Sequence, residues 1–250
     1  MKRACLAAAT LVLALAPGVA AACSVGPGYR VPSNLELAAQ AETIVIARVV
    51  GATQDEDGDA YANTVVIRPL AAIKGELPQG DIALPGMGLA QGRVATLGTL
   101  SNPYEFRTAH PVSYMGACIR TVFPLGTTIL AFLRTGHEGM WAPAGDAFSR
   151  WAEDVPDANA PWVQLVRLYT IAAGLPEADR APFLEDEREA LMARSGEPLA
   201  QLMADDIARQ LAGPGATEES FEDAFREPAE ESAVEAALKR MRQSAVEAGN

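Results

Sequence analysis

Histidine, cysteine and positive charge are all scarce in this chain. Its 250 residues include two histidines, three cysteines and 20 Lys and Arg against 32 Asp and Glu, which gives a formal net charge of -12. Because contacts to phosphates need a basic stripe, the shortage of positive charge argues against nucleic acid as a partner. Apolar residues make up 49% of the chain, which is ample for one or two folded domains.

Long uncharged apolar runs are also missing, apart from one near the beginning of the chain. Lys2 and Arg3 precede the apolar run 6–15, and Pro17-Gly18 separates that run from three alanines that end at Ala22. This order predicts a secretory signal peptide over residues 1–22, and hence a secreted or periplasmic protein. A run of about ten residues is shorter than the roughly 20 needed to cross a bilayer, so no transmembrane segment is expected in the mature chain.

Cleavage after Ala22 would make Cys23 the first residue, and two processing routes then remain open. Lipidation of the Cys23 thiol would produce an envelope lipoprotein, whereas ordinary cleavage would leave Cys23 available for a disulfide. Cys5 is removed with the signal, so the mature chain keeps only Cys23 and Cys118. An even pair in an oxidising compartment favours the Cys23–Cys118 disulfide, and the lipid anchor is the alternative.

Residues 23–150 have the pattern of a small β domain. Runs rich in β-branched and aromatic residues predict strands, and each run is bounded by Gly or Pro. Repeated strand and turn with no long helix between them predicts a closed antiparallel barrel or sandwich. The expected strands are 43–50, 61–68, 81–84 and 127–133.

Residues 151–250 differ, because their apolar side chains recur at helical spacing. Gly and Pro at 174–176, 196–198 and 213–215 mark where helices end and restart. We therefore expect an α+β protein, with an α-helical extension over 151–215 and an acidic, helical or partly disordered tail over 216–250. The three apolar series are Trp162, Leu165, Val166 and Tyr169; Leu199, Met203, Ile207 and Leu211; and Val234, Leu238 and Met241.

The order of several segments between residues 23 and 145 resembles a netrin-like domain, the family that includes the tissue inhibitors of metalloproteases. The resemblance implies an OB-like five-stranded antiparallel barrel, in which the first cysteine ties the amino terminus to a later strand. The segments that carry it are mature Cys23, residues 41–51, the strand 64–67 leading into 70–75, and Cys118 followed by 123–133.

In the inhibitors of that family, the amino group and carbonyl of the first cysteine chelate the catalytic zinc of the target protease. Cys23 matches that position, so the resemblance implies a possible zinc-protease-binding edge at Cys23 and Ser24. The inhibitors begin Cys-x-Cys and contain several disulfides, whereas this chain has a single possible pair. Metalloprotease inhibition is therefore an alternative function, and a structural disulfide is the simpler interpretation.

Evidence for catalysis is sparse in the sequence. His110 and His137 are the only side chains that ordinarily titrate near neutral pH, and neither has metal-ligand spacing or a neighbouring nucleophile motif. We expect both histidines on the surface in turns, and we expect no catalytic residue, metal or cofactor. A hydrolase at the junction of the two halves would require one histidine to approach an acidic residue in a pocket.

Two further groups of residues allow a functional and a structural interpretation. Asp55-Glu-Asp-Gly-Asp59 offers oxygen ligands for calcium, but Ala60 and Val66 replace the Gly and Glu that an EF-hand loop needs, so a hairpin turn is favoured. The aromatics Phe148, Trp141, Trp151 and Trp162 could line a groove, and packing of the first helix onto the barrel is favoured. The sequence therefore predicts a non-enzymatic binding protein with a protein or cell-envelope partner.

Overall fold

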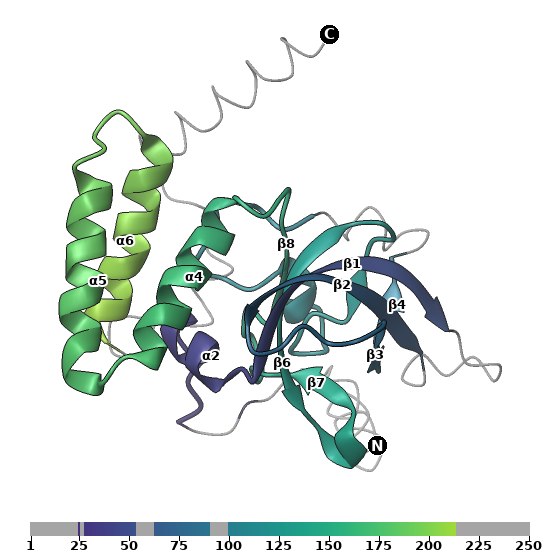
Figure 1. Cartoon of the computed structure of the whole chain (residues 1–250). Coiled ribbons are helices and arrows are strands. Elements are labelled where there is room, and N and C mark those ends of the chain that lie inside the picture. The colour runs from purple at the N-terminus through teal and green to yellow at the C-terminus, as the bar shows by residue number, and fades with distance from the viewer. Residues whose placement is uncertain (1–24, 26–27, 54–62, 91–99, 214–250) are drawn as a thin grey trace, which may run out of the picture.

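The computed structural model describes residues 25, 28–53, 63–90 and 100–213, which form an α+β fold (Figure 1). The expected signal peptide, Cys23, Ser24, the acidic residues 55–59 and the expected tail 216–250 lie outside these residues. In chain order the elements are α2 (Asn34–Gln40), β1 (Thr43–Thr53), β2 (Thr64–Lys74), β3 (Ile82–Pro85), β4 (Gly88–Leu89), η1 (Pro111–Tyr114), β5 (Val122–Phe123), β6 (Thr128–Thr135), η2 (His137–Gly139), β7 (Trp141–Pro143), β8 (Ala152–Asp154), α4 (Pro161–Gly174), α5 (Glu177–Met192) and α6 (Pro198–Ala212).

The main sheet is antiparallel and has the strand order β3-β2-β1-β6-β7. The short strand β8 also pairs with β6, next to the part of β6 that pairs with β7. β7 and β8 therefore occupy one strand position that residues 144–151 interrupt. β4 and β5 form a separate two-stranded parallel sheet.

The expected closed five-stranded barrel is wrong for the described residues. The sheet has six strands, and no hydrogen-bonded pairing joins its end strands β3 and β7. Irregularities in the β1–β2 register let the sheet curl, and Cα atoms of β3 and β7 come within 8 Å of one another. Both end strands are short, with four and three residues, so little backbone is available to close the circle.

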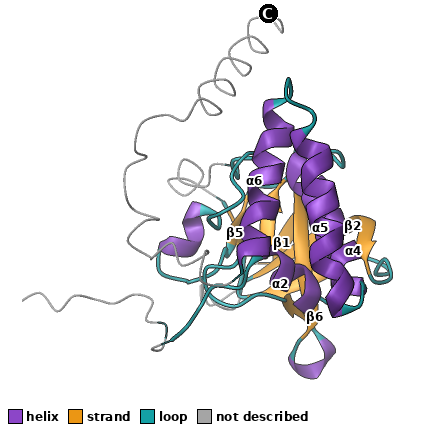
Figure 2. Ribbon diagram, turned by 90° about the vertical axis from the view of Figure 1, so that its left-hand side faces the viewer, coloured by secondary structure: helices purple, strands orange, loops and turns teal. Residues whose placement is uncertain are grey.

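The sheet separates two hydrophobic cores, because alternate residues of a strand point to opposite faces. Ile44 and Ile46 of β1 belong to the core beneath the helices, which we call the helix-side core. Val45, Ala47 and Val49 belong to the core enclosed by the curled sheet, which we call the inner core. Figure 2 shows the helices lying together over one face of the sheet.

The described helices α4, α5 and α6 confirm the helices expected after residue 150, but one helix lies earlier in the chain than expected. The buried face of α4 contains Trp162, Leu165, Val166 and Tyr169, and α6 buries Met203 and Ile207. However, α2 precedes the first strand, where Ser33 and Glu36 form a capping box that fixes its start. The boundary expected at residue 150 also falls inside the sheet, because β8 pairs with β6 after it.

Candidate functional site

Residues 100–121 form a long irregular segment whose only regular element is the short helix η1. We call it the pinned segment, because buried polar contacts fix it at several points along its length. It contains one Glu and two Arg side chains, in a chain with 32 acidic and 20 basic residues. Long irregular segments of compact domains are commonly functional, so each contact that fixes it bears on function.

The two ends of the pinned segment meet at Asp154, the last residue of β8. Oδ2 of Asp154 accepts hydrogen bonds from Nη2 of Arg120 at 2.7 Å and from the backbone N–H of Ser101 at 2.9 Å. The guanidinium of Arg120 also donates to the carbonyl of Ala152 and lies 4.6 Å from the ring centroid of Phe123. Arg120 is 1% exposed, so this ion pair belongs to the protein interior.

The middle of the pinned segment is attached to the neighbouring residue of the same strand. The backbone N–H of His110 donates to Oε1 of Glu153 at 3.1 Å, and Nε of Arg150 lies 3.5 Å from the same oxygen. The guanidinium of Arg150 lies over the ring of Trp162 at 4.2 Å. Arg150 and Glu153 are both buried, as Arg120 and Asp154 are.

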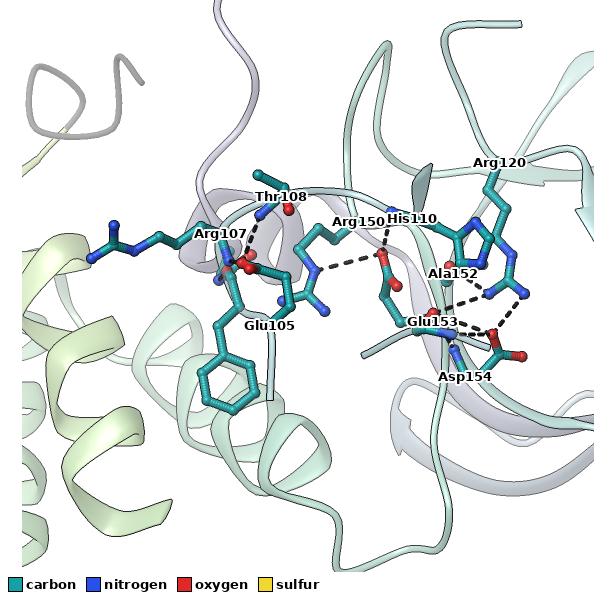
Figure 3. Close-up of polar contacts among 12 residues, drawn as sticks. Glu105, Arg107, Thr108, His110, Arg120, Arg150, Ala152, Glu153 and Asp154 are labelled. Carbon is teal, nitrogen blue, oxygen red and sulfur yellow. Dashed lines mark hydrogen bonds and ion pairs between the residues drawn. The ribbon is translucent and has the colours of Figure 1, made fainter. Parts of the chain in front are cut away.

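β8 therefore presents a carboxylate to each face of the sheet (Figure 3). On one face Glu153 forms an ion pair with Arg150, whose aromatic neighbour Trp162 belongs to the helix-side core. On the other face Asp154 bonds Arg120, whose neighbour Phe123 belongs to the inner core. Removing one member of such a buried pair leaves an uncompensated charge, so the contacts hold the segment firmly.

A third attachment joins the pinned segment to the helices. Asn34, at the start of α2, donates from Nδ2 to the carbonyl of Phe106 at 2.8 Å and to the carboxylate of Asp206 in α6. Tyr169 of α4 donates to the same carboxylate at 2.5 Å, and Arg209 bonds it as well. Burial, followed by the charge of Asp206, raises the pKa of Tyr169 well above its usual value.

Tyr114 ends η1 and connects the pinned segment to residues 146–148. Its ring stacks on Phe148 with 5.1 Å between centroids, and burial raises its pKa. The N–H of Phe148 donates to the carbonyl of Cys118 at 2.6 Å. The hydroxyl of Tyr29 donates to the carbonyl of the adjacent residue, Ala147, at 2.5 Å. The amino-terminal segment therefore runs beside the part of the fold that holds Cys118.

Although its backbone is fixed, the pinned segment exposes apolar side chains to solvent. Leu100 is 59% exposed and Met115 is 58% exposed. Leu100 precedes Ser101, and Met115 follows Tyr114, so each lies next to a residue with buried contacts. A rigid backbone that presents apolar side chains is suited to binding, because little conformational entropy is lost when a partner binds.

The structure revises the two predicted histidine positions differently. His137 is exposed, as expected, with 90% of its side-chain surface accessible. His110 is 2% exposed, so its expected surface position is wrong. Its Nδ1 accepts the N–H of Val112, which makes it the cap of η1. The hydrogen bond from its backbone to Glu153 of β8 holds His110 in the interior, and the local sequence around His110 does not indicate this contact.

Of the remaining predicted site residues, Cys118 and the tryptophans lie within the described part of the chain. Cys118 is half-buried in a turn with φ of 61°, and its expected partner Cys23 lies outside the described residues, as does Ser24. Trp151 and Trp162 are buried core residues, as favoured, but they lie on opposite faces of the sheet. Within the described ranges, no group of three or more His, Cys, Asp or Glu side chains could hold a metal ion.

Sequence reasoning missed Arg120, Arg150, Glu153 and Asp154. Charged side chains are mostly exposed, so the sequence does not predict that these four are buried. One available signal was the sequence Trp151-Ala-Glu-Asp-Val155, in which charges interrupt an otherwise apolar run. A second signal was the large number of polar residues between Leu100 and Thr121, because polar side chains need hydrogen-bond partners wherever they are buried.

Comparisons with known proteins returned no relatives. No protein-family model matches the chain, and neither the curated proteins nor the solved structures contain a match. In the part of the chain that the structure describes, none of the helices has the length and apolar character required to cross a membrane.

Proposed function

We propose that this chain is an exported, non-enzymatic binding protein of the bacterial cell envelope or periplasm, and that it contacts a protein or envelope partner through the pinned segment. The observation that carries the proposal is the combination of a fixed backbone and exposed apolar side chains in residues 100–121. Leu100 and Met115 are each more than half exposed, although Ser101 and Arg120 are held by the same buried carboxylate.

The charge of the pinned segment also supports an interface. Its Asp, Glu, Lys and Arg side chains number three; of these, Arg120 is neutralised by Asp154, and Glu105 accepts the backbone N–H groups of Arg107 and Thr108. Depletion of charge is a feature of the centres of protein interfaces, where aromatic residues and Met are enriched. Tyr104, Tyr114 and Met115 supply those residue types here.

Site-specific photo-crosslinking tests the proposed contact in the native envelope. A photoreactive residue replaces Met115 in one strain and Met192 in another, because Met192 is also exposed, at 44%, but lies at the end of α5. We expect a discrete adduct from position 115 and not from position 192. The substitution Leu100→Asp is expected to remove the adduct without unfolding the protein, since Leu100 is exposed. Absence of an adduct from position 115, or identical adducts from both positions, would contradict the proposal.

A second candidate function is metalloprotease inhibition through the amino terminus at Cys23. It is supported by the path of the amino-terminal segment, because Tyr29 bonds Ala147 next to Phe148, and Phe148 bonds the carbonyl of Cys118. Cys23 lies six positions before Tyr29, and a stretch of this length can span roughly 20 Å at about 3.4 Å per position. A Cys23–Cys118 disulfide is therefore within reach, and it would hold the terminal amine rigidly.

Extending the mature amino terminus by one Ala tests this candidate directly. The added residue displaces the free amine from Cys23 but leaves both cysteines in place, so inhibition of a zinc protease is expected to disappear while the fold persists. Equal inhibition by the extended and the unextended protein would exclude this mechanism. A lipid attached to Cys23 would exclude it as well, and would identify the envelope lipoprotein instead.

The kinship with netrin-like domains also remains our proposal. It is supported by the strand order, because the third, second and first strands of the chain are followed in the sheet by β6 and β7, and by the proximity of β3 and β7. OB-type domains are five-stranded and partly open, which suits a sheet whose end strands approach without pairing.

A further inference from the structure

His110 caps η1 with its imidazole ring, where helices more commonly use a hydroxyl or a carboxylate. Nδ1 of His110 accepts the backbone N–H of Val112 at 3.2 Å, and the carbonyl of His110 accepts the N–H of Ser113 at 2.8 Å. A ring nitrogen that accepts a hydrogen bond carries no proton. The closed conformation of η1 therefore requires Nδ1 to be unprotonated.

Protonation of His110 would act on this cap in two ways. A proton on Nδ1 would turn the acceptor into a donor that faces the N–H donor of Val112, so the hydrogen bond would be lost. It would also place a positive charge on a residue that is 2% exposed, where the charged form is poorly solvated. Val112 and Ser113 are themselves buried, so the uncapped N–H groups would lack solvent until η1 opened.

Several charged groups near His110 make buried contacts of their own. Glu153 of β8 bonds the His110 backbone and pairs with Arg150, while Asp154 pairs with Arg120 from the far end of the segment (Figure 3). From the pinned segment itself, Glu105 accepts two backbone N–H groups of its own turn. Arg150 and Arg120 add positive charge to this region, which opposes protonation of the ring.

We propose that His110 is a pH-sensitive latch on the pinned segment: protonation of its imidazole uncaps η1 and opens the middle of the segment, while Asp154 continues to hold both ends. The closed state binds fewer protons at His110 than the open state, so closure weakens as the pH falls through the range near 6.5 where histidines ordinarily titrate. Its role in regulating binding rests on the proposed function of the segment. The opening itself requires no partner.

The chain provides its own reference group for the test. It contains only two histidines, and the second, His137, is exposed with 90% of its side-chain surface accessible. The imidazole signals of the full mature protein in NMR spectra therefore comprise one buried and one exposed ring. We expect protonation of the His110 ring to require a lower pH than an ordinary histidine does, because its charged form is disfavoured in the interior.

Amide hydrogen exchange of Val112 then measures the opening. Between pH 7.5 and 5.5 its protection factor, corrected for the intrinsic exchange rate, is expected to fall by up to about tenfold per pH unit, the limit for one coupled proton. The variant His110→Asn retains a side chain that caps helices well but does not titrate. We expect its Val112 protection to be independent of pH, and His137→Asn to behave as the unmodified protein does.

Two results would overturn the latch. One is a Val112 protection factor that stays constant over this pH range in the unmodified protein, and the other is the same decline in His110→Asn. If His110→Asn fails to fold, the unmodified protein alone tests the proposal. A decline in Val112 protection that does not follow the titration of the His110 imidazole also contradicts it. Since no partner is present, a failure of the crosslinking experiment leaves this measurement unaffected.

Discussion

Among single residues, Asp154 joins parts of the chain that lie far apart in the sequence. Its carboxylate is 6% exposed and accepts hydrogen bonds from Arg120 and Ser101, which lie at the two ends of the pinned segment. The substitution Asp154→Asn keeps the shape and removes the charge, which leaves the guanidinium of Arg120 buried without a counter-ion. We expect a loss of about 3–5 kcal/mol in the free energy of unfolding, measured by urea denaturation.

The matched control for this prediction is Asp81→Asn. Asp81 also pairs with an arginine, Arg68, at 2.8 Å, but both side chains are well exposed. Water and salt screen an exposed pair, so the urea midpoint is expected to change little. Similar losses in the two variants would show that burial does not determine the strength of the Arg120–Asp154 pair.

A second residue-scale prediction concerns Tyr29 and alkaline pH. Burial, followed by the charge of Asp146, raises the pKa of Tyr29 from 10.0 to about 12, and its hydroxyl donates to Ala147. A raised pKa means that the folded state holds the proton more tightly, so this stabilisation is complete below pH 10 and is lost between pH 10 and 12. In chemical denaturation, Tyr29→Phe is expected to be less stable than the unmodified protein at pH 8 and to lose less stability as the pH rises.

The same substitution at Tyr104 serves as the comparison, since Tyr104 is half-buried as Tyr29 is. If Tyr29→Phe and the unmodified protein lose stability in parallel above pH 10, then the Tyr29 hydroxyl does not contribute in the folded state.

At the scale of elements, the end of β2 depends on Gly75. Its φ is +72°, and a Cβ atom there would lie 2.7 Å from the carbonyl oxygen of Glu42, immediately before β1. Gly80 also has a positive φ, +83°, but a Cβ atom there would meet no atom within 4 Å. Both Gly→Ala substitutions impose backbone strain of about 1 kcal/mol, whereas only Gly75→Ala adds a backbone clash.

We therefore expect Gly75→Ala to lower the thermal unfolding midpoint by clearly more than Gly80→Ala. Equal shifts would mean that the chain near Glu42 moves to accept the added methyl group without loss of stability. Only the left-handed backbone conformation would then matter at these two positions.

The elements that sequence reasoning found are those with a strong local pattern. Strands β1, β2, β3 and β6 have β-branched runs between glycines and prolines, and the buried faces of α4 and α6 repeat at three and four residues. The missed strands β4, β5, β7 and β8 contain two or three residues each, which is too short for a periodic signal. They form because distant segments meet, and no local pattern encodes such pairing.

The same reasoning explains why the candidate site was harder to predict than the fold. Arg120 and Asp154 are 34 residues apart, and His110 and Glu153 are 43 apart, so each contact depends on the complete sheet. His110 resembled a surface histidine in a proline-containing loop, because local sequence reports the turn and not its burial. Trp162, in contrast, was correctly interpreted as a core residue, since burial of a large aromatic side chain in a helix follows from its periodic face.

For the whole molecule, the decisive covalent question is whether the amino terminus is tied to the sheet. Tyr29 bonds Ala147, and Phe148 bonds the carbonyl of Cys118, so the amino-terminal segment already runs toward Cys118. A Cys23–Cys118 disulfide would close a loop of about 95 residues, for which chain entropy predicts a stabilisation of roughly 4–5 kcal/mol. The intact mass of the mature protein is therefore expected to show two thiol labels only after reduction, together with a lower urea midpoint. Labelling of Cys118 before reduction would contradict the disulfide. A lipid-sized mass increase on Cys23 would instead identify a membrane anchor.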